Sequence, residues 1–240
     1  MPHFFIDSKN VNNNVAVISD KENYNHIVKS LRAKTGENIL LIDEKQIQYE
    51  GIIEKITKDV IDIKINKSYK SNRSLSFKLY LAQSPLRSEA QSLIIEKATE
   101  LGVDGVYPIF SDNCVLKKSV IEQKVQKWQK IMFEASKQCE RAYVPTCFEP
   151  FDLDLLLKTV KFDRILALTE RSANYHLKEY LAQNPILKNE QILVIIGPEG
   201  GFSACEFEYF NKNNITTLSL GNLILKAETA VITALGNIVL

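Results

Sequence analysis

The first part of the chain alternates apolar and polar residues in short runs, a pattern typical of strands that bury one face. The predicted strands are residues 3–6, 15–18, 39–42, 48–56 and 60–65. One short helix is predicted over residues 20–30, with Asp20 as its cap. The pattern therefore predicts a small β-barrel domain over residues 1–70.

The remainder of the chain alternates between strands and helices. A polar stretch over residues 66–74 (NKSYKSNRS) has no apolar period and is interpreted as the linker before it. The predicted strands are 75–82, 105–110, 164–168, 192–196 and 217–220, and the predicted helices are 89–101, 120–141, 175–183, 204–213 and 227–239. Such alternation predicts an α/β domain with a parallel sheet over residues 74–240.

The most informative stretch is ILVIIGPEGGFSACEFEYF, residues 192–210. Its apolar, mostly β-branched start predicts a buried parallel strand. The three glycines of GPEGG (residues 197–201) allow positive φ and close approach of a ligand to the main chain. Ser203 and Glu206 then form a capping-box pattern. Ligands of open α/β sheets bind at such strand ends, although a tight strand–helix turn without a ligand would have the same local pattern.

Two further strand ends carry similar turns. One is ALTER, residues 167–171, and the other is LSLGNLILKAETA, residues 218–230, in which Asn222 can adopt a left-handed turn geometry. The second turn leads into an apolar C-terminal helix that is predicted to be buried or to form a dimer interface. Three such loops predict one composite pocket.

The usual nucleotide fingerprints, GxGxxG and GxxxxGK[ST], are absent from the sequence. Their absence argues against a nucleotide held by its phosphates. It favours a ligand that is recognised through backbone amides and carbonyls.

Composition narrows the class without naming a function. The net charge of +1 makes a nucleic-acid partner a matter of local patches. No apolar run approaches the roughly 18 residues of a membrane span, and the N-terminus lacks a signal-peptide pattern, so a cytoplasmic protein is expected. The four cysteines form no CxxC pair and the three histidines have no metal-ligand spacing, so no metal and no disulfide framework are expected.

The three loops together resemble the bacterial small-subunit (16S) ribosomal RNA uridine-N3 methyltransferase family, within the SPOUT superfamily. The segments HIVKSLRAKTGENILLID, LIIEKATELGVDGVYPIFSDNCV and WQKIMFEASKQCERAYVP match the same family, so the resemblance covers nearly the whole chain. It implies an N-terminal PUA-like RNA-binding barrel, a C-terminal domain with a deep trefoil knot, a homodimer with RNA bound across both subunits, and S-adenosylmethionine (SAM) as the methyl donor.

The resemblance also implies which residues bind the cofactor. They are Leu168, Thr169 and Glu170 in the first loop, Ile196, Gly197, Glu199, Gly200 and Gly201 in the second, and Leu218, Leu220, Gly221, Leu225 and Ala230 in the third.

Several positions depart from the family pattern. Leu223 and Asn113 stand where the family usually has arginine, and Lys226 replaces another arginine. Lysine is a point charge and not a bidentate fork. These replacements therefore affect the expected RNA contacts more than the expected cofactor contacts.

The predicted chemistry is methyl transfer to N3 of a uracil. That nitrogen carries a proton and lies on the Watson–Crick edge, so the base must be unpaired and deprotonated. Arg141 and Gln138 are candidates for holding the uracil oxygens, Glu199 for handling the proton or the cofactor, and Glu228 for orienting a pocket group. For each, the alternative is an exposed helix end, a helix-terminal charge or a polar turn residue.

RNA contact is expected on three basic patches, each of which could also be a solvated face. The patches contain Lys67, Lys70 and Arg73; Lys117 and Lys118 in a lysine-rich segment over residues 117–130; and His26, Lys29 and Arg32. The alternative functions are a ribose 2′-O-methyltransferase of the same superfamily and a non-catalytic RNA-binding relative.

Overall fold

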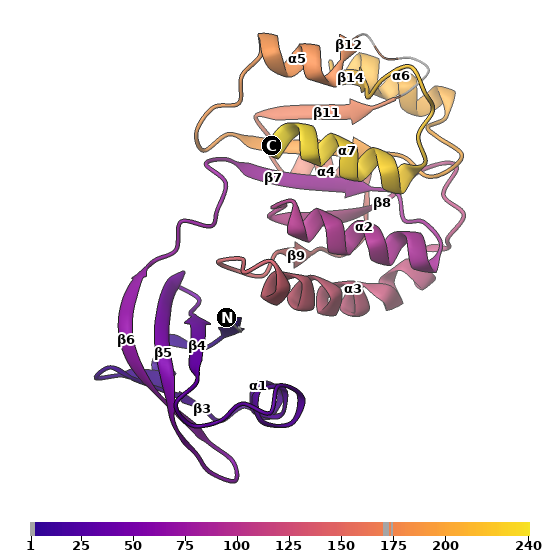
Figure 1. The fold of residues 1–240 in the computed structure, drawn as a ribbon. Coiled ribbons are helices and arrows are strands. Elements are labelled where there is room, and N and C mark those ends of the chain that lie inside the picture. The colour runs from indigo at the N-terminus through magenta and orange to yellow at the C-terminus, as the bar shows by residue number, and fades with distance from the viewer. Residues whose placement is uncertain (1–2, 170–172, 174) are drawn as a thin grey trace. The chain divides into compact units, whose positions relative to one another are not determined.

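The computed structural model describes residues 3–169, 173 and 175–240. The chain forms two compact units (Figure 1). The N-terminal unit comprises Met1–Ser74 together with Ser136–Tyr143, and the C-terminal unit comprises Leu75–Ala135 together with Val144–Leu240. A segment from the middle of the sequence is thus part of the N-terminal unit.

The N-terminal unit is built on a six-stranded sheet with the order β1-β4-β5-β6-β3-β2. Its elements are β1 (His3–Phe5), η1 (Ser8–Asn10), β2 (Val11–Asn12), β3 (Val15–Ile18), α1 (Lys21–Asn25), η2 (His26–Ser30), β4 (Asn38–Ile42), β5 (Ile47–Ile56) and β6 (Ile61–Lys70). Alternate residues of these strands, such as Ile39, Leu41, Ile61 and Ile63, are buried in one core. Asp20 caps α1 by accepting a hydrogen bond from the Asn23 N–H at 2.8 Å, as predicted.

Strand β6 is longer than the sequence predicted. Residues 67–70, part of the stretch interpreted as a linker, pair with β5 in an antiparallel register that joins Tyr69 to Gln48. The Tyr69 hydroxyl also donates to the Glu50 carboxylate at 2.8 Å. The stretch is polar because most of its side chains face solvent, and an exposed strand needs no apolar period.

The C-terminal unit contains a parallel sheet with the order β10-β8-β7-β13-β11-β14-β12, and β9 also pairs with β8. Its strands are β7 (Lys78–Gln83), β8 (Gly105–Phe110), β9 (Thr146–Cys147), β10 (Phe151–Asp152), β11 (Arg164–Leu168), β12 (Tyr175–His176), β13 (Gln191–Ile196) and β14 (Thr216–Ser219). The predicted parallel α/β sheet is confirmed.

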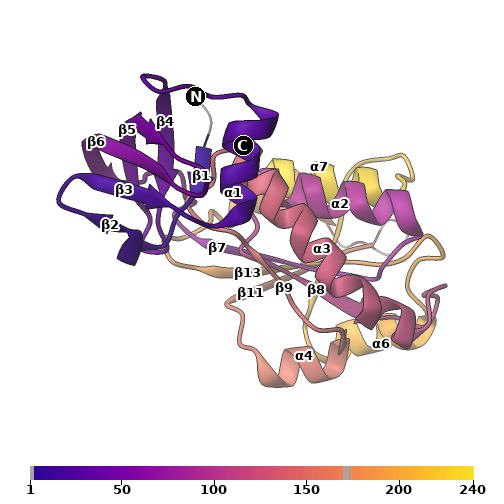
Figure 2. The ribbon, with the colours of Figure 1, turned by 90° about the horizontal axis from the view of Figure 1, so that it is seen from below.

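Helices cover both faces of this sheet. They are α2 (Ser88–Glu100), α3 (Lys118–Gln138), α4 (Leu153–Thr159), α5 (Leu177–Gln183), α6 (Ala204–Lys212) and α7 (Ala227–Val239). Figure 2 shows α2, α3 and α7 on one face and α4 and α6 on the other. Consequently the residues of β13 alternate between two cores: Val194 lies with the first group of helices and Leu193 and Ile195 with the second. This burial on both faces explains the unbroken apolar run.

Several predicted boundaries are wrong. Helix α3 ends at Gln138 and not at residue 141, because Glu140 adopts a left-handed conformation (φ +56°) that ends a helix. That position usually holds glycine, so a glutamate there is no stop signal in the sequence. Tyr175–His176, predicted as helix, pairs with β14 as a strand. Helix α4 was not predicted at all.

Candidate functional site

A cavity of about 290 Å³ lies where β11, β13 and β14 end, and these three strands are neighbours in the sheet. The end of β11 with Thr169 and the loops after β13 and β14 line it. The lining residues are Leu168, Thr169, Ile196, Gly197, Pro198, Glu199, Gly200, Gly201, Phe202, Phe207, Leu218, Leu220, Ile224, Leu225, Ala227 and Ala230. The three strand ends that the sequence singled out therefore do form one pocket.

The loop after β13 brings main chain to the cavity surface. Gly201 has a φ of +70°, which an L side chain rarely adopts, and a Cβ on Gly197 would lie 3.2 Å from the Phe202 ring. The loop ends in the predicted capping box, in which the Ser203 N–H donates to the Glu206 carboxylate at 2.7 Å and the Glu206 N–H donates to Ser203 Oγ at 3.2 Å. Burial raises the pKa of Glu206 above its ordinary value.

Thr169 contributes an unsatisfied polar atom to the cavity wall. The residue is 3% exposed, and its Oγ1 has no hydrogen-bond partner among the described residues. A buried hydroxyl without a partner costs free energy unless a ligand or water satisfies it. The cavity wall therefore combines a threonine whose hydroxyl is unsatisfied with glycine backbone and leucine side chains.

The charge of the cavity wall is also distinctive. Glu199 is the only charged residue among the lining residues that the structure describes, and no lysine or arginine is included. A phosphate group would find no cation there. The wall instead favours a ligand with an apolar ring, polar edges and a positive charge.

Most of the predicted cofactor residues line this cavity, with two exceptions. Glu170 lies outside the described residues. Gly221 instead lines a second cavity, together with His176, Ser219 and Asn222. Its φ is +154°, whereas Asn222 is not among the described residues with positive φ, so the glycine and not the asparagine makes the turn.

Sequence reasoning missed five lining residues: Pro198, Phe202, Phe207, Ile224 and Ala227. Phe202 and Phe207 make an edge-to-face pair with ring centroids 6.4 Å apart. Both lie next to positions that were singled out, and Phe207 is one helical turn after Ser203. This closeness in sequence to the predicted residues was the signal that could have identified both phenylalanines as lining residues.

The four predicted catalytic residues are divided between the two units. Glu199 lines the cavity. Glu228 lies half-buried in the first turn of α7 and is not among the lining residues, although Ala227 and Ala230 are. Gln138 is the last residue of α3 and Arg141 lies beyond the helix, and both belong to the N-terminal unit.

Arg141 is held firmly within the N-terminal unit. It is 7% exposed, its guanidinium lies 4.9 Å from the Tyr143 ring centroid, and its N–H donates to the Ser136 carbonyl at 3.0 Å. An ion pair between Arg73 and Glu140 joins the segment Ser136–Tyr143 to the residues that follow β6. Arg141 is therefore a largely buried side chain and not the exposed helix end that was the alternative.

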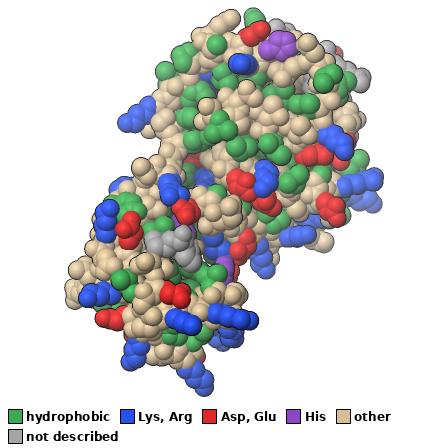
Figure 3. Space-filling view, viewed as in Figure 1, with side chains coloured by type: hydrophobic (Ala, Val, Ile, Leu, Met, Phe, Trp, Pro, Cys, Tyr) green, Lys and Arg blue, Asp and Glu red, His purple; other side chains and the backbone are tan. Residues whose placement is uncertain are grey.

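The predicted RNA-binding residues differ in their exposure to solvent and in the contacts that their side chains make. Lys29, Arg32, Lys117 and Lys118 are exposed. In the predicted linker, Lys67 lies over the Tyr69 ring and Lys70 donates to the Lys45 carbonyl at 2.6 Å. His26 is half-buried against Phe4. On the face shown in Figure 3, basic and acidic side chains are interspersed and form no single positive field.

No group of three or more His, Cys, Asp or Glu side chains in residues 3–169, 173 and 175–240 is arranged to hold a metal ion. None of the helices described for this chain combines the length and apolar character that a bilayer span requires.

Both units match known protein families. The family model for an RNA methyltransferase domain matches residues 73–239, and that for an RNA methyltransferase PUA domain matches residues 18–66. Ribosomal RNA small subunit methyltransferase E from Mesomycoplasma hyopneumoniae is 30% identical over 97% of this chain and 96% of its own, and the protein of that name from Bacillus subtilis is 28% identical over 90% and 87%.

Solved structures agree. A Legionella pneumophila protein in complex with the bound cofactor SAM has a TM-score of 0.83 and 27% identity, covering 98% of this chain and 95% of its own. A ribosomal RNA small subunit methyltransferase E from Neisseria gonorrhoeae has a TM-score of 0.82 over the same shares, and at 22% identity it supports the fold alone.

Proposed function

The chain belongs to the RNA methyltransferase family whose domain model spans residues 73–239, and on that premise we propose that it methylates N3 of a specific uridine in 16S ribosomal RNA with SAM as the methyl donor. The observation that carries this proposal is the cavity formed by the loops after β11, β13 and β14. The relatives named as small-subunit ribosomal RNA methyltransferases, which match nearly the full chain, support the substrate class.

The lining residues fit SAM. The Thr169 hydroxyl has no partner among the described residues, and we propose that a polar edge of the ligand satisfies it. Leu218, Leu220 and Leu225 provide an apolar wall suited to the adenine ring, and Glu199 provides a negative charge for a cationic ligand. When bound, SAM supplies a methyl group that its sulfonium already activates.

The remaining work falls to the chain. It must hold an unpaired uracil, remove the N3 proton and stabilise the resulting negative charge on the uracil oxygens. We assign the oxygens to Arg141 and Gln138, because a guanidinium and an amide are the donors that such oxygens need. Glu199 is assigned to the proton or the cofactor, and Glu228 to orienting a pocket group.

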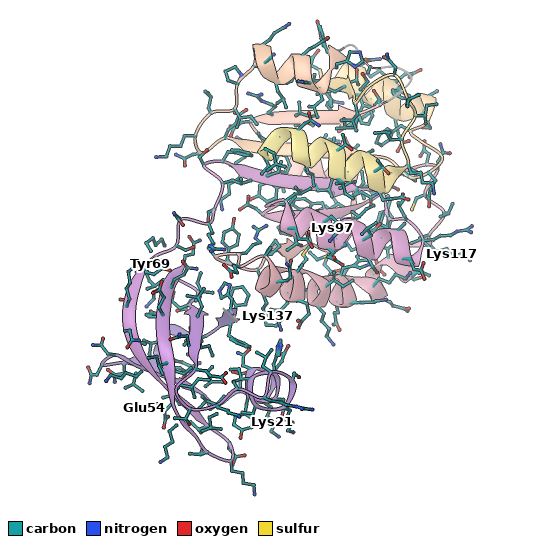
Figure 4. All side chains as sticks on the ribbon, viewed as in Figure 1. Lys21, Glu54, Tyr69, Lys97, Lys117 and Lys137 are labelled. Carbon is teal, nitrogen blue, oxygen red and sulfur yellow. The ribbon has the colours of Figure 1, made fainter. Side chains whose placement is uncertain are left out.

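RNA is proposed to bind through the basic residues His26, Lys29, Arg32, Lys67, Lys70, Arg73, Lys117 and Lys118. Figure 4 labels Lys117, which lies on the side of the C-terminal unit toward which β7 and β11 point. The cavity lies at those same strand ends. A cation there can contact the backbone of an RNA whose target base enters the cavity.

We further propose that the chain works in the cytoplasm as a homodimer, and that its C-terminal segment forms the trefoil knot implied by the family resemblance. The homodimer, like the knot, rests on that resemblance. Light scattering that gives the mass of one chain would contradict the dimer.

The test is mass spectrometry of 16S ribosomal RNA from cells with and without the gene. The expected result is loss of one N3-methyluridine in the deletion strain and its return when the gene is restored. A methyl group that maps to a ribose 2′ oxygen, or ribosomal RNA that is identical in both strains, would refute the proposal.

A further inference from the structure

The loop that follows β8 crosses the end of β7 and reaches the loop after β13. In the sheet, β7 lies between β8 and β13, so these two loops do not follow neighbouring strands. The Ser111 and Ser84 hydroxyl groups are 2.7 Å apart, and the Ser84 N–H donates to the Ile196 carbonyl at 3.1 Å. These hydrogen bonds hold the start of the loop after β8 against the ends of β7 and β13.

Asn113 sits at the far end of this crossing. Its side-chain amide donates to the carbonyls of Gly201 and Gly200 at 3.0 Å and 3.4 Å. A Cβ on Gly200 would lie 3.1 Å from the Asn113 Cβ, a distance tighter than most real contacts. The glycine at position 200 therefore permits the approach that lets Asn113 bond both carbonyls.

Asp112 makes a second connection to the same loop. Its carboxylate accepts a hydrogen bond from the Ser203 hydroxyl, and its N–H donates to the Glu206 carboxylate at 3.3 Å. Ser203 and Glu206 are the two partners of the capping box that starts α6. Asp112 and Asn113 thus hold both the middle and the end of the loop.

These contacts orient the backbone of the cavity wall. In a trans peptide the C=O and N–H groups point in opposite directions. Fixing the carbonyls of Gly200 and Gly201 on Asn113 therefore directs the N–H groups of Gly201 and Phe202 away from the β8 loop. Within the turn, the Gly201 N–H donates to the Pro198 carbonyl at 2.9 Å, and at its start the Gln83 side-chain amide donates to the Gly197 carbonyl at 3.5 Å.

We propose that Asp112 and Asn113 are positioning residues that hold residues 197–203 in the shape that binds SAM. This inference rests on the proposed function of that loop. It also gives a role to Asn113, which the sequence suggested only as a lost RNA-binding arginine.

The first experiment needs no cofactor. Hydrogen exchange of peptides covering residues 197–206 is measured in the wild type, in Asn113→Ala and in Asn113→Asp, which keeps the size of the side chain and loses the donor. Exchange is expected to accelerate several-fold in both variants. Asn213→Ala is the matched control, because it removes one amide-to-carbonyl bond, to Tyr209 at 2.9 Å, at the other end of α6. Unchanged exchange in the Asn113 variants would overturn the proposal.

The second experiment measures SAM affinity by calorimetry and the KM for SAM. We expect Asn113→Asp to weaken binding about fivefold, the effect of a typical lost hydrogen bond, with the KM for RNA and kcat at saturating SAM retained. Asn113→Gln, which keeps a donor, is expected to recover part of the affinity.

The outcomes separate the two proposals. A wild type that binds SAM alongside Asn113 variants of equal affinity overturns only the positioning role. A wild type that binds no SAM refutes the proposed function and the positioning role with it.

Discussion

The cavity of the C-terminal unit and the Arg141 region of the N-terminal unit are built in different ways. The cavity uses main chain and apolar side chains from three loops, each next to its strand in sequence. The Arg141 region joins Ser136–Tyr143 to the residues just after β6, which are far away in sequence, through side chains such as the pair Arg73–Glu140. The first kind of site leaves a trace in glycines and turns, whereas the second leaves almost none.

The two regions also differ in what remains unsatisfied. Thr169 lines the cavity, and its buried hydroxyl has no partner among the residues that the structure describes. In the N-terminal unit, both ring nitrogens of His3 lack partners within the described part of the chain, and the residue is only 5% exposed. The proposed function gives the first a ligand to bond, whereas the second makes folding sensitive to pH.

The largest effect is expected from a substitution that lowers the catalytic rate and leaves cofactor binding intact. Arg141→Ala should lower kcat by about 100-fold, the effect of losing one group that stabilises developing negative charge. SAM affinity should stay unchanged, because Arg141 does not line the cavity. Single-turnover methyl transfer and calorimetry measure the two quantities. Arg141→Lys keeps the charge without the planar fork and should recover little of the rate. Wild-type rates in Arg141→Ala would remove this residue from the chemistry.

The next effect concerns His3, whose pKa is lowered to about 4, chiefly by burial and in part by Arg73, against an opposing effect of Glu140. The folded state then binds fewer protons than the unfolded state below pH 6.5. Stability is therefore full above that pH and is lost as the pH falls toward 4. Linkage gives a loss of about 2 kcal/mol between pH 7.5 and 5.

Urea unfolding of the wild type and of His3→Leu at both pH values tests this expectation. The variant lacks the titrating group and should lose about 2 kcal/mol less than the wild type over the same interval. Equal losses in the two proteins would mean that His3 is solvated or paired in solution.

Thr169→Val sharpens the comparison because its two expected effects have opposite signs. Removing an unpartnered buried hydroxyl should raise the free energy of unfolding of the free protein by about 1 kcal/mol, and should weaken SAM binding about fivefold. Thr99→Val is the matched control, since its hydroxyl already bonds the Ile95 carbonyl at 2.8 Å in α2. That variant should lose stability and keep its affinity. A Thr169→Val protein that binds SAM as tightly as the wild type would show that the hydroxyl does not face the cofactor.

The smallest effect is expected at the exposed lysines. Lys118→Ala should weaken RNA binding about two- to threefold at moderate salt and reduce the slope of log affinity against log salt by about one. Lys212→Ala, an exposed lysine on α6, should leave both quantities unchanged. Filter binding across a salt series provides the measurement. A slope that does not change would place RNA elsewhere.

The sequence by itself determined much of the cavity. The apolar run of β13, the glycines after it and the Ser203–Glu206 capping pattern are local features, because strand burial, positive φ and helix capping each depend on a few adjacent residues. Because such features depend on neighbouring residues, the parallel sheet could also be predicted from the sequence. For the same reason the three loops could be identified from the family resemblance.

The tertiary structure decided what depends on residues far apart in the chain. It placed Ser136–Tyr143 in the N-terminal unit, ended α3 at Gln138 before a left-handed Glu140, and left both ring nitrogens of His3 without a partner among the described residues. It also brought Asn113 to the carbonyls of Gly200 and Gly201, 87 and 88 positions later. Such contacts are made by packing between elements, and neither residue type nor spacing encodes a partner that far away. An asparagine that the sequence presented as a lost arginine therefore emerged as part of the cavity's support only once the chain was folded.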